Sequence, residues 1–334
     1  MNKLDASAHE HGRTAAHPRD IPWRGWWDIT VRVWNSLSRD NVSLMAAGLA
    51  MYGLLAVFPA LAAMVSLYGL FVTPAQVVQQ MSGFAHQMPP GVWELLQAQL
   101  QDVASHQHRT LSASVAVGFL IALWSASSGM SSVMTAANVA YGEREQRGFL
   151  MQTAIAVLMT VGAVVGFILM LAFAFAVPAV LAMLGASPGV KIVGEVVPWL
   201  LLWGFAVLAL AIIYRLAPSR EPPRWHWVTR GSGVAATLWI LGTVLFTLYA
   251  RLFASYQKTY GELSGVVVLL MWFYLSGFLV VLGAEINAES ERQTVKDTTT
   301  GPPAPLGRRG ASAADTVGPT AEQADPEQQH PSGG

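Results

Sequence analysis

Six long apolar stretches dominate this chain of 334 residues. A membrane-spanning helix needs roughly 20 apolar residues to cross a hydrocarbon core of about 30 Å, because backbone groups in lipid must hydrogen-bond within their own segment. Hydrophobic residues make up 53% of the chain and charged residues only 12%, a balance that indicates a lipid solvent. We therefore predict an all-α, polytopic membrane protein. Its six predicted spans cover about 44–71, 111–134, 155–184, 196–216, 231–253 and 263–282.

The basic residues predict the direction of the spans, because short loops rich in Lys and Arg stay in the cytoplasm. Of the 20 Lys and Arg residues, the N-terminal tail carries six, the second loop two, the fourth loop four and the C-terminal tail four. The opposite side carries the remaining four. We therefore expect both termini to be cytoplasmic.

The two tails have different predicted structures. In residues 1–43, a cytoplasmic tail, Trp residues alternate with charges at near-helical spacing between Trp23 and Trp34. This spacing predicts an amphipathic helix in the headgroup layer with indole anchors, and packing of these Trp side chains on the bundle is the alternative. Residues 292–334 are predicted to be a disordered cytoplasmic tail, because the composition beyond Lys296 is polar and has no apolar period.

The loop between the first two spans, residues 72–110, is long enough to hold structure of its own. Two helical patterns in it are separated by Pro89, Pro90 and Gly91. We expect an external helical hairpin that rests on the outer boundary of the membrane.

Several functional classes lack their usual residues. The chain has no Cys, all eight His residues lie in tails or loops, and no acidic residue lies at the centre of a span. His106 and His108 form a pair without an obvious third ligand, which falls short of a normal metal site. A P-loop, a dinucleotide-binding pattern and a zinc-protease motif are absent from the sequence. We therefore predict no catalytic residues, no metal site, no cofactor and no enzymatic activity.

The second span ends in a small, polar run that contains Ser125 and Ser128. Such residues let helices approach closely, which is the packing interpretation, or they line a polar path through the bundle. Asn138 and Tyr141 follow on one helical face near the cytoplasmic surface. They are candidates for a cap at the helix end or for contact with a lipid headgroup.

The last span ends in a group of polar residues that includes Glu285 and Asn287. Glu285 is close enough to the hydrocarbon to be a functional candidate, paired with a cytoplasmic Arg. The alternative is a solvated helix end, with Glu289 and Glu291 in water.

Two short segments suggest an inverted 3+3 repeat. Tyr141 to Glu143 follows the second span on the inside, and Tyr260 to Glu262 follows the fifth on the outside. Inverted repeats of three spans are common in secondary transporters, with the binding site between the halves. The repeat predicts a cavity between spans two and five. The candidates for a polar path or headgroup contact are thus Ser125, Ser128, Asn138, Tyr141, Tyr249, Tyr256, Tyr260, Glu285 and Asn287.

Ordered blocks from about Trp34 to Glu291 resemble the YihY/BrkB family of bacterial inner-membrane proteins. The blocks are AxxAxY at 47–52 with Phe58-Pro59, LWSAS at 123–127, NxxYG at 138–142, Tyr249 ahead of YxxxYG at 256–261, and LGAEINA at 282–288. The tails fall outside the resemblance.

The resemblance implies a six-helix, multi-pass protein of the bacterial inner membrane without an established catalytic mechanism. Family members have been labelled ribonuclease BN, but this sequence lacks the carboxylate or His cluster that metal-assisted cleavage needs, and it lacks a basic stripe suited to RNA. We expect a transporter-like or lipid-handling protein with membrane lipids as partners and no nucleic acid. The alternative is a non-catalytic scaffold for envelope protein partners.

Overall fold

The computed structural model describes residues 9–68, 98, 113–183, 188–252 and 263–324. Every regular element in these ranges is a helix, apart from one isolated bridge between Pro223 and Thr299. The all-α prediction is therefore confirmed for the described residues. The longer helices are α2 (Trp23–Arg39), α3 (Val42–Tyr68), α6 (Ala113–Tyr141), α7 (Phe149–Met183), α8 (Pro188–Leu216), α9 (Trp225–Leu252) and α11 (Leu263–Glu291), and the short ones are η1 (Pro18–Asp20), α12 (Ser312–Asp315) and α13 (Ala321–Ala324).

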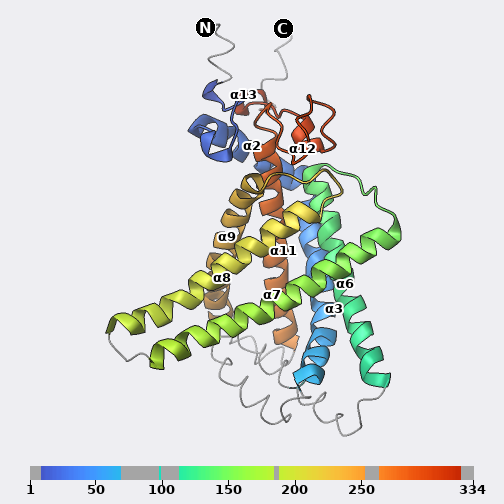
Figure 1. Ribbon diagram of the computed structural model, residues 1–334, viewed down its shortest axis with the longest axis vertical. Helices are drawn as coiled ribbons and strands as arrows, with labels where there is room; N and C mark the ends of the chain where they lie inside the picture. The colour runs from blue at the N-terminus through green and yellow to red at the C-terminus, as the bar shows by residue number, and fades with distance from the viewer. Residues whose placement is uncertain (1–8, 69–97, 99–112, 184–187, 253–262, 325–334) are drawn as a thin grey trace.

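The six longest helices pack in a closed cycle that follows the order of the chain (Figure 1). Helix α3 packs against α6, α6 against α7, α7 against α8, α8 against α9, and α9 against α11. Helix α11 closes the cycle on α3 and also contacts α6 and α2. The pair α7 and α8 runs obliquely across the other helices in Figure 1. Helix α11, the last of the six, therefore packs between α9 and α3, the first of the six.

The outer surface of the bundle is apolar. Large hydrophobic side chains such as Leu158, Leu200 and Leu245 are exposed on α7, α8 and α9. A helix that is hydrophobic all round belongs in a protein core or in a membrane. Since these side chains face outward, lipid is the solvent that suits them.

Four described helical segments are long and apolar enough to cross a membrane, and a fifth is added if the bent pair of α2 and α3 counts as one span. The four are Phe149–Met170, Val196–Leu216, Trp225–Ala250 and Ser264–Glu291. The sequence predicted six. Helix α6, the predicted second span, is not among these four segments, which were found among the described residues alone. The chain is thus a multi-pass membrane protein with four or five candidate spans among its described residues.

Helix α2 meets α3 at an angle of 65°. Asn41 makes the bend with a φ of 52°, a left-handed conformation that Asn tolerates better than most residues. The Trp-rich helix predicted between Trp23 and Trp34 forms as the larger part of α2. Its indoles at Trp23, Trp27 and Trp34 are exposed along one side, which we call the Trp face.

The opposite side of α2 is polar and buried. Asp28, Arg32 and Ser36 follow one another at intervals of four residues, so they share one face of the helix, and all three are buried. That face packs against α11. Helix α2 therefore turns Asp28 and Arg32 into the protein and its Trp face outward.

The prediction of a disordered C-terminal tail is wrong for residues 292–324, which fold back onto the bundle. The Arg309 guanidinium donates hydrogen bonds to four backbone carbonyls, among them those of Val295 and Ala314, at 2.6 and 2.7 Å. Ala313 packs into a buried cluster with Tyr141 and Tyr214. Composition alone missed this order because hydrogen bonds and small side chains, rather than an apolar period, hold the segment.

Residues near the N-terminus are also ordered. Ala15 and Ile21 pack with Trp227 of α9, and the Arg13 backbone carbonyl accepts a hydrogen bond from the Val295 N–H at 2.9 Å. The described parts of both tails therefore lie at the same end of the bundle, beside α2, α12 and α13 (Figure 1). We call this end the polar end.

Several predictions fall outside the described residues. These are the external hairpin at 72–110, apart from Ala98, the His106 and His108 pair, and the segment Tyr260 to Glu262 that carries half of the predicted inverted repeat.

Candidate functional site

A buried ion-pair cluster joins α2 to α11 at the polar end. The Arg32 Nε lies 2.6 Å from a carboxylate oxygen of Glu289, and both side chains are almost fully buried. Arg292 contacts the other oxygen of Glu289 at 2.5 Å. Arg32 also donates hydrogen bonds to the Gln293 side chain at 2.7 Å and to the Pro319 carbonyl at 2.8 Å. One carboxylate thus bridges two guanidinium groups, and the C-terminal segment is bonded to the same cluster.

A second buried pair lies beside it. Arg220, in the loop between α8 and α9, contacts Glu291 at 2.7 Å, and neither side chain is exposed. Thr298 donates a hydrogen bond to the other oxygen of Glu291 at 2.8 Å, and the Arg220 guanidinium lies 4.3 Å from the centre of the Tyr141 ring. The alternative that placed Glu289 and Glu291 in water is therefore wrong. Both acids hold the polar end together.

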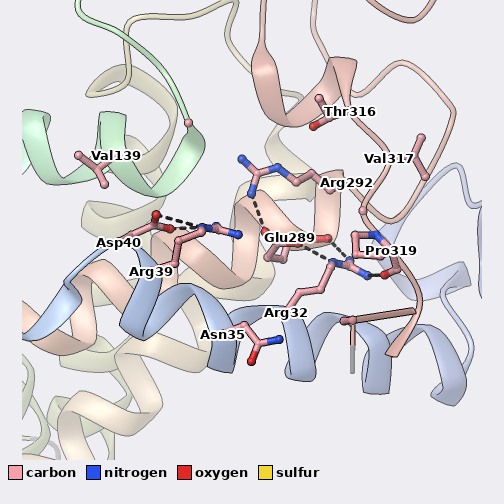
Figure 2. Close-up of a pocket in the computed structure, with 13 residues that line it drawn as sticks. Arg32, Asn35, Arg39, Asp40, Val139, Glu289, Arg292, Thr316, Val317 and Pro319 are labelled. Carbon is pink, nitrogen blue, oxygen red and sulfur yellow. Dashed lines mark hydrogen bonds and ion pairs between the residues drawn. The ribbon is translucent and has the colours of Figure 1, made fainter. Parts of the chain in front are cut away.

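A cavity of about 470 Å³ opens beside the first cluster, between α2, α11, the end of α6 and the C-terminal segment (Figure 2). Three arginines line it: Arg32 and Arg39 on α2, and Arg292 just beyond α11. Its acidic lining residues are Asp40 and Glu289. Its other lining residues are Asn35, Val139, Gly142, Thr316, Val317, Gly318, Pro319 and Ala324.

Asn138 ties two loops together. Its Nδ2 donates a hydrogen bond to Glu145 at 3.0 Å, and its Oδ1 accepts one from the Ser219 backbone N–H at 2.7 Å. Arg147 also binds Glu145, at 2.7 Å, and its hydrogen bonds lower the pKa of that carboxyl to about 2, with Asn138 adding to the effect. Asn138 therefore ties the end of α6 to these two loops, and contact with a lipid headgroup stays a prediction.

Asn287 joins α11 to α9. Its Oδ1 accepts a hydrogen bond from the Gly231 N–H at 2.9 Å, and its Nδ2 donates one to the Val228 carbonyl at 3.1 Å. Gly231 and Gly283 allow this close approach, because a Cβ on Gly231 would lie 2.5 Å from the Gly283 carbonyl oxygen. Asn287 is thus a buried contact between two helices.

Glu285 has no such partners. It lies on α11, is fully buried, and neither carboxylate oxygen has a hydrogen-bond partner among the described residues. The expected pairing with an Arg is therefore not found there. Burying a carboxyl without a partner costs free energy, so a role outside folding is the usual reason for keeping one.

Replacing Glu285 with Met is expected to raise the free energy of unfolding by about 1–3 kcal/mol, because it removes a buried acid that has no partner. Glu289→Met, the same change one helical turn further, is the matched control. It should destabilise the protein, since Arg32 and Arg292 would lose their counter-charge. Unfolding of the detergent-solubilised protein measures both. A less stable Glu285→Met variant would mean that this carboxyl makes a contact that the fold needs.

The serine run bonds to its own helix. Ser127 and Ser128 both donate hydrogen bonds to the Trp124 carbonyl, at 2.7 and 3.1 Å, and Ser132 donates to the Ser128 carbonyl at 3.1 Å. Ser125 is half-buried on the same stretch of α6. Small residues that satisfy their hydroxyls in this way suit the close packing of α6, and the polar path stays a prediction.

The predicted site residues do not gather in one place. Asn138, Tyr141, Glu285 and Asn287 lie towards the polar end. Tyr249 lies near the other end of α9, 22 residues beyond Trp227, a rise of about 33 Å along the helix. Tyr256 and Tyr260 lie outside the described residues.

Sequence reasoning missed the residues that build the cavity. Arg32, Arg39 and Arg292 were counted only as basic residues that set the orientation. The spacing of Asp28, Arg32 and Ser36 was the available signal, because polar residues at every fourth position form one face of a helix. The described residues contain no group of three or more His, Asp or Glu side chains placed to hold a metal ion.

Comparison with known proteins places the chain among membrane proteins. The family model described as Virulence factor BrkB matches residues 33–306. The UPF0761 membrane protein of Aeromonas salmonicida is 29% identical over 264 residues, which cover 77% of this chain and 86% of that protein. A UPF0761 membrane protein of Cronobacter sakazakii is 26% identical over 274 residues, or 80% and 89% of the two chains.

A third relative is named after an enzyme rather than as a membrane protein. It is the putative ribonuclease-like protein YfkH of Bacillus subtilis, 30% identical over 256 residues, which cover 73% of this chain and 88% of that protein. No solved structure matches the chain. The resemblance inferred from the motif blocks is confirmed by these matches.

Proposed function

The chain belongs to the Virulence factor BrkB family, and two of its relatives are named as membrane proteins. On that premise, we propose that it is a transporter-like protein that handles lipids. In this proposal it lies in the bacterial inner, or plasma, membrane. Its ligands are membrane lipids that reach the cavity at the polar end. The proposal involves no catalytic step, no cofactor and no nucleic acid.

The proposed topology has six spans with the polar end and both termini in the cytoplasm. The six longest helices, α3, α6, α7, α8, α9 and α11, follow one another as neighbours in the bundle, which suits alternating passes. The loops and tails that the basic residues marked as cytoplasmic meet at the polar end. An inverted 3+3 repeat remains part of this proposal, resting on the two Tyr-Gly-Glu segments.

The observation that carries the proposal is the position of the cavity next to the Trp face. Asn35 and Arg39 line the cavity, and Trp34 is exposed on the neighbouring side of the same helix. Indole side chains prefer the headgroup level of a bilayer. If the Trp face rests there, the cavity is within reach of lipid headgroups.

The test is leaflet-to-leaflet movement of a fluorescent phospholipid in vesicles that contain the purified protein. The wild-type protein is expected to move lipid well above the rate in protein-free vesicles. Val139→Trp should slow this movement about tenfold, because Val139 lines the cavity without taking part in its ion pairs and a larger side chain would fill it.

Val165→Trp is the matched control. Val165 is exposed on α7, away from the cavity, so the same enlargement should leave the rate unchanged. Lipid movement no faster than in empty vesicles would overturn the proposal. Equal rates in the wild type and Val139→Trp would place any lipid path elsewhere in the bundle.

A further inference from the structure

The charges that line the cavity do not cancel. Three guanidinium groups, from Arg32, Arg39 and Arg292, face the carboxylates of Asp40 and Glu289. Arg39 pairs with Asp40 at 3.0 Å, while Glu289 is shared by Arg32 and Arg292. Three positive groups against two negative ones leave an excess of one positive charge, so the cavity favours an anion.

Several side-chain N–H groups in the cavity wall are available to donate hydrogen bonds to that anion. Arg39 uses its Nε and Nη2 on Asp40 and Ser36, and its Nη1 has no partner among the described residues. Arg292 uses Nη1 and Nη2, and its Nε is likewise without one. The Asn35 side chain also makes no hydrogen bond within the described part of the chain and adds an amide donor to the wall. The Arg39 side chain is 61% exposed, so a ligand can reach it.

Size and donor type point to a phosphate. A volume of about 470 Å³ lies within the range of small-ligand sites, roughly 300–1,000 Å³. Guanidinium groups present several N–H donors in a planar fork that matches phosphate oxygens. At the level of the Trp face, lipid phosphates are the anions present at the highest density.

We infer that this cavity binds a phosphate group, with Arg39, Arg292 and Asn35 as its donors. The inference rests on the proposed function for its setting and names the ligand class of the same site. Two sources share this chemistry, the headgroup of an anionic phospholipid and a free phosphate. The ordered residues 316–319 form one wall of the cavity, so the C-terminal segment is part of the site.

Asn35 allows a test that leaves every ion pair in place. We expect Asn35→Asp to weaken binding about tenfold, because it adds a negative charge of the same shape to the wall. Asn35→Lys should strengthen binding by a similar factor. Gln146→Glu is the control, since it makes the same charge change at an exposed residue of the polar end that does not line the cavity, and it should change affinity less than twofold.

Titration calorimetry of the full-length protein in detergent measures the dissociation constants for two probes. These are dioctanoyl phosphatidic acid and inorganic phosphate. Binding of the lipid alone, sensitive to Asn35, assigns the site to a headgroup. Binding of both probes with the same sensitivity assigns it to phosphate itself. If Asn35→Asp and Asn35→Lys bind both probes as the wild type does, or if neither probe binds, the inference is wrong.

The two tests can fail separately. Phosphate binding that depends on Asn35, together with no lipid movement in vesicles, would overturn the proposed function and leave the phosphate site standing. Lipid movement that Val139→Trp blocks, together with no effect of Asn35, would overturn the phosphate site alone.

Discussion

Replacing Glu291 with Gln is expected to lower the free energy of unfolding by about 3–5 kcal/mol. Arg220 is fully buried, and Glu291 is its only ion-pair partner among the described residues. The Nε and Nη1 of Arg220 have no hydrogen-bond partner there either. A neutral side chain at position 291 would leave a buried cation without a counter-charge. Denaturant unfolding of the detergent-solubilised protein measures the loss.

Two further variants make this result specific. Glu322→Gln removes the same charge from an exposed position on α13 and should change stability by less than about 0.5 kcal/mol. Replacing Arg220 and Glu291 together with Met and Leu should recover most of the loss, because an apolar pair leaves no charge unpaired. If Glu291→Gln were as stable as the wild type, the buried pair would contribute nothing to the fold.

A loss of stability is also expected on substitution of Gly231. A Cβ added there would lie 2.5 Å from the Gly283 carbonyl oxygen, which is backbone and cannot rotate away. It would also displace the Asn287 side chain, which accepts a hydrogen bond from the Gly231 N–H at 2.9 Å. Gly231→Ala should therefore separate α9 from α11 and cost about 1–3 kcal/mol by unfolding in detergent.

Gly233→Ala is the matched control on the same helix. Apart from the backbone of α9 and the two adjacent residues, no described heavy atom lies within 4 Å of a Cβ built at that position. Alanine is the better helix former by about 0.5–1 kcal/mol, and Gly233→Ala should be slightly stabilising. Opposite signs for the two variants would establish the close contact between α9 and α11. Equal effects would contradict it.

The sequence predicted the helices well because lipid imposes a simple rule. A segment that crosses a bilayer must be apolar and long, and each predicted span overlaps one long described helix, with bounds that differ by up to nine residues. The Trp pattern similarly predicted α2. The polar end was harder to predict, since the contact between Arg32 and Glu289 joins residues 257 positions apart, and nothing local specifies it.

The candidate site was predicted only in part. Asn138 and Asn287 were candidates because they lie at the cytoplasmic ends of predicted spans, and in the structure both make hydrogen bonds to neighbouring elements. Glu285 keeps its candidate role, since its carboxyl has no partner among the described residues. The cavity itself depends on the C-terminal segment, whose composition gave no sign of order.

The distant partners of Arg32 also bear on how the protein is made. Its contacts with Glu289 and Pro319 cannot form until the ribosome has synthesised those residues. At about 5–20 residues per second, α2 spends on the order of 10–50 s after its own synthesis before α11 is complete. During that time its buried polar face has no partner, and the Trp face gives the waiting helix a membrane surface to rest on. Residues near the end of the described chain, such as Pro319, therefore fix the position of α2, one of the first helices to be translated.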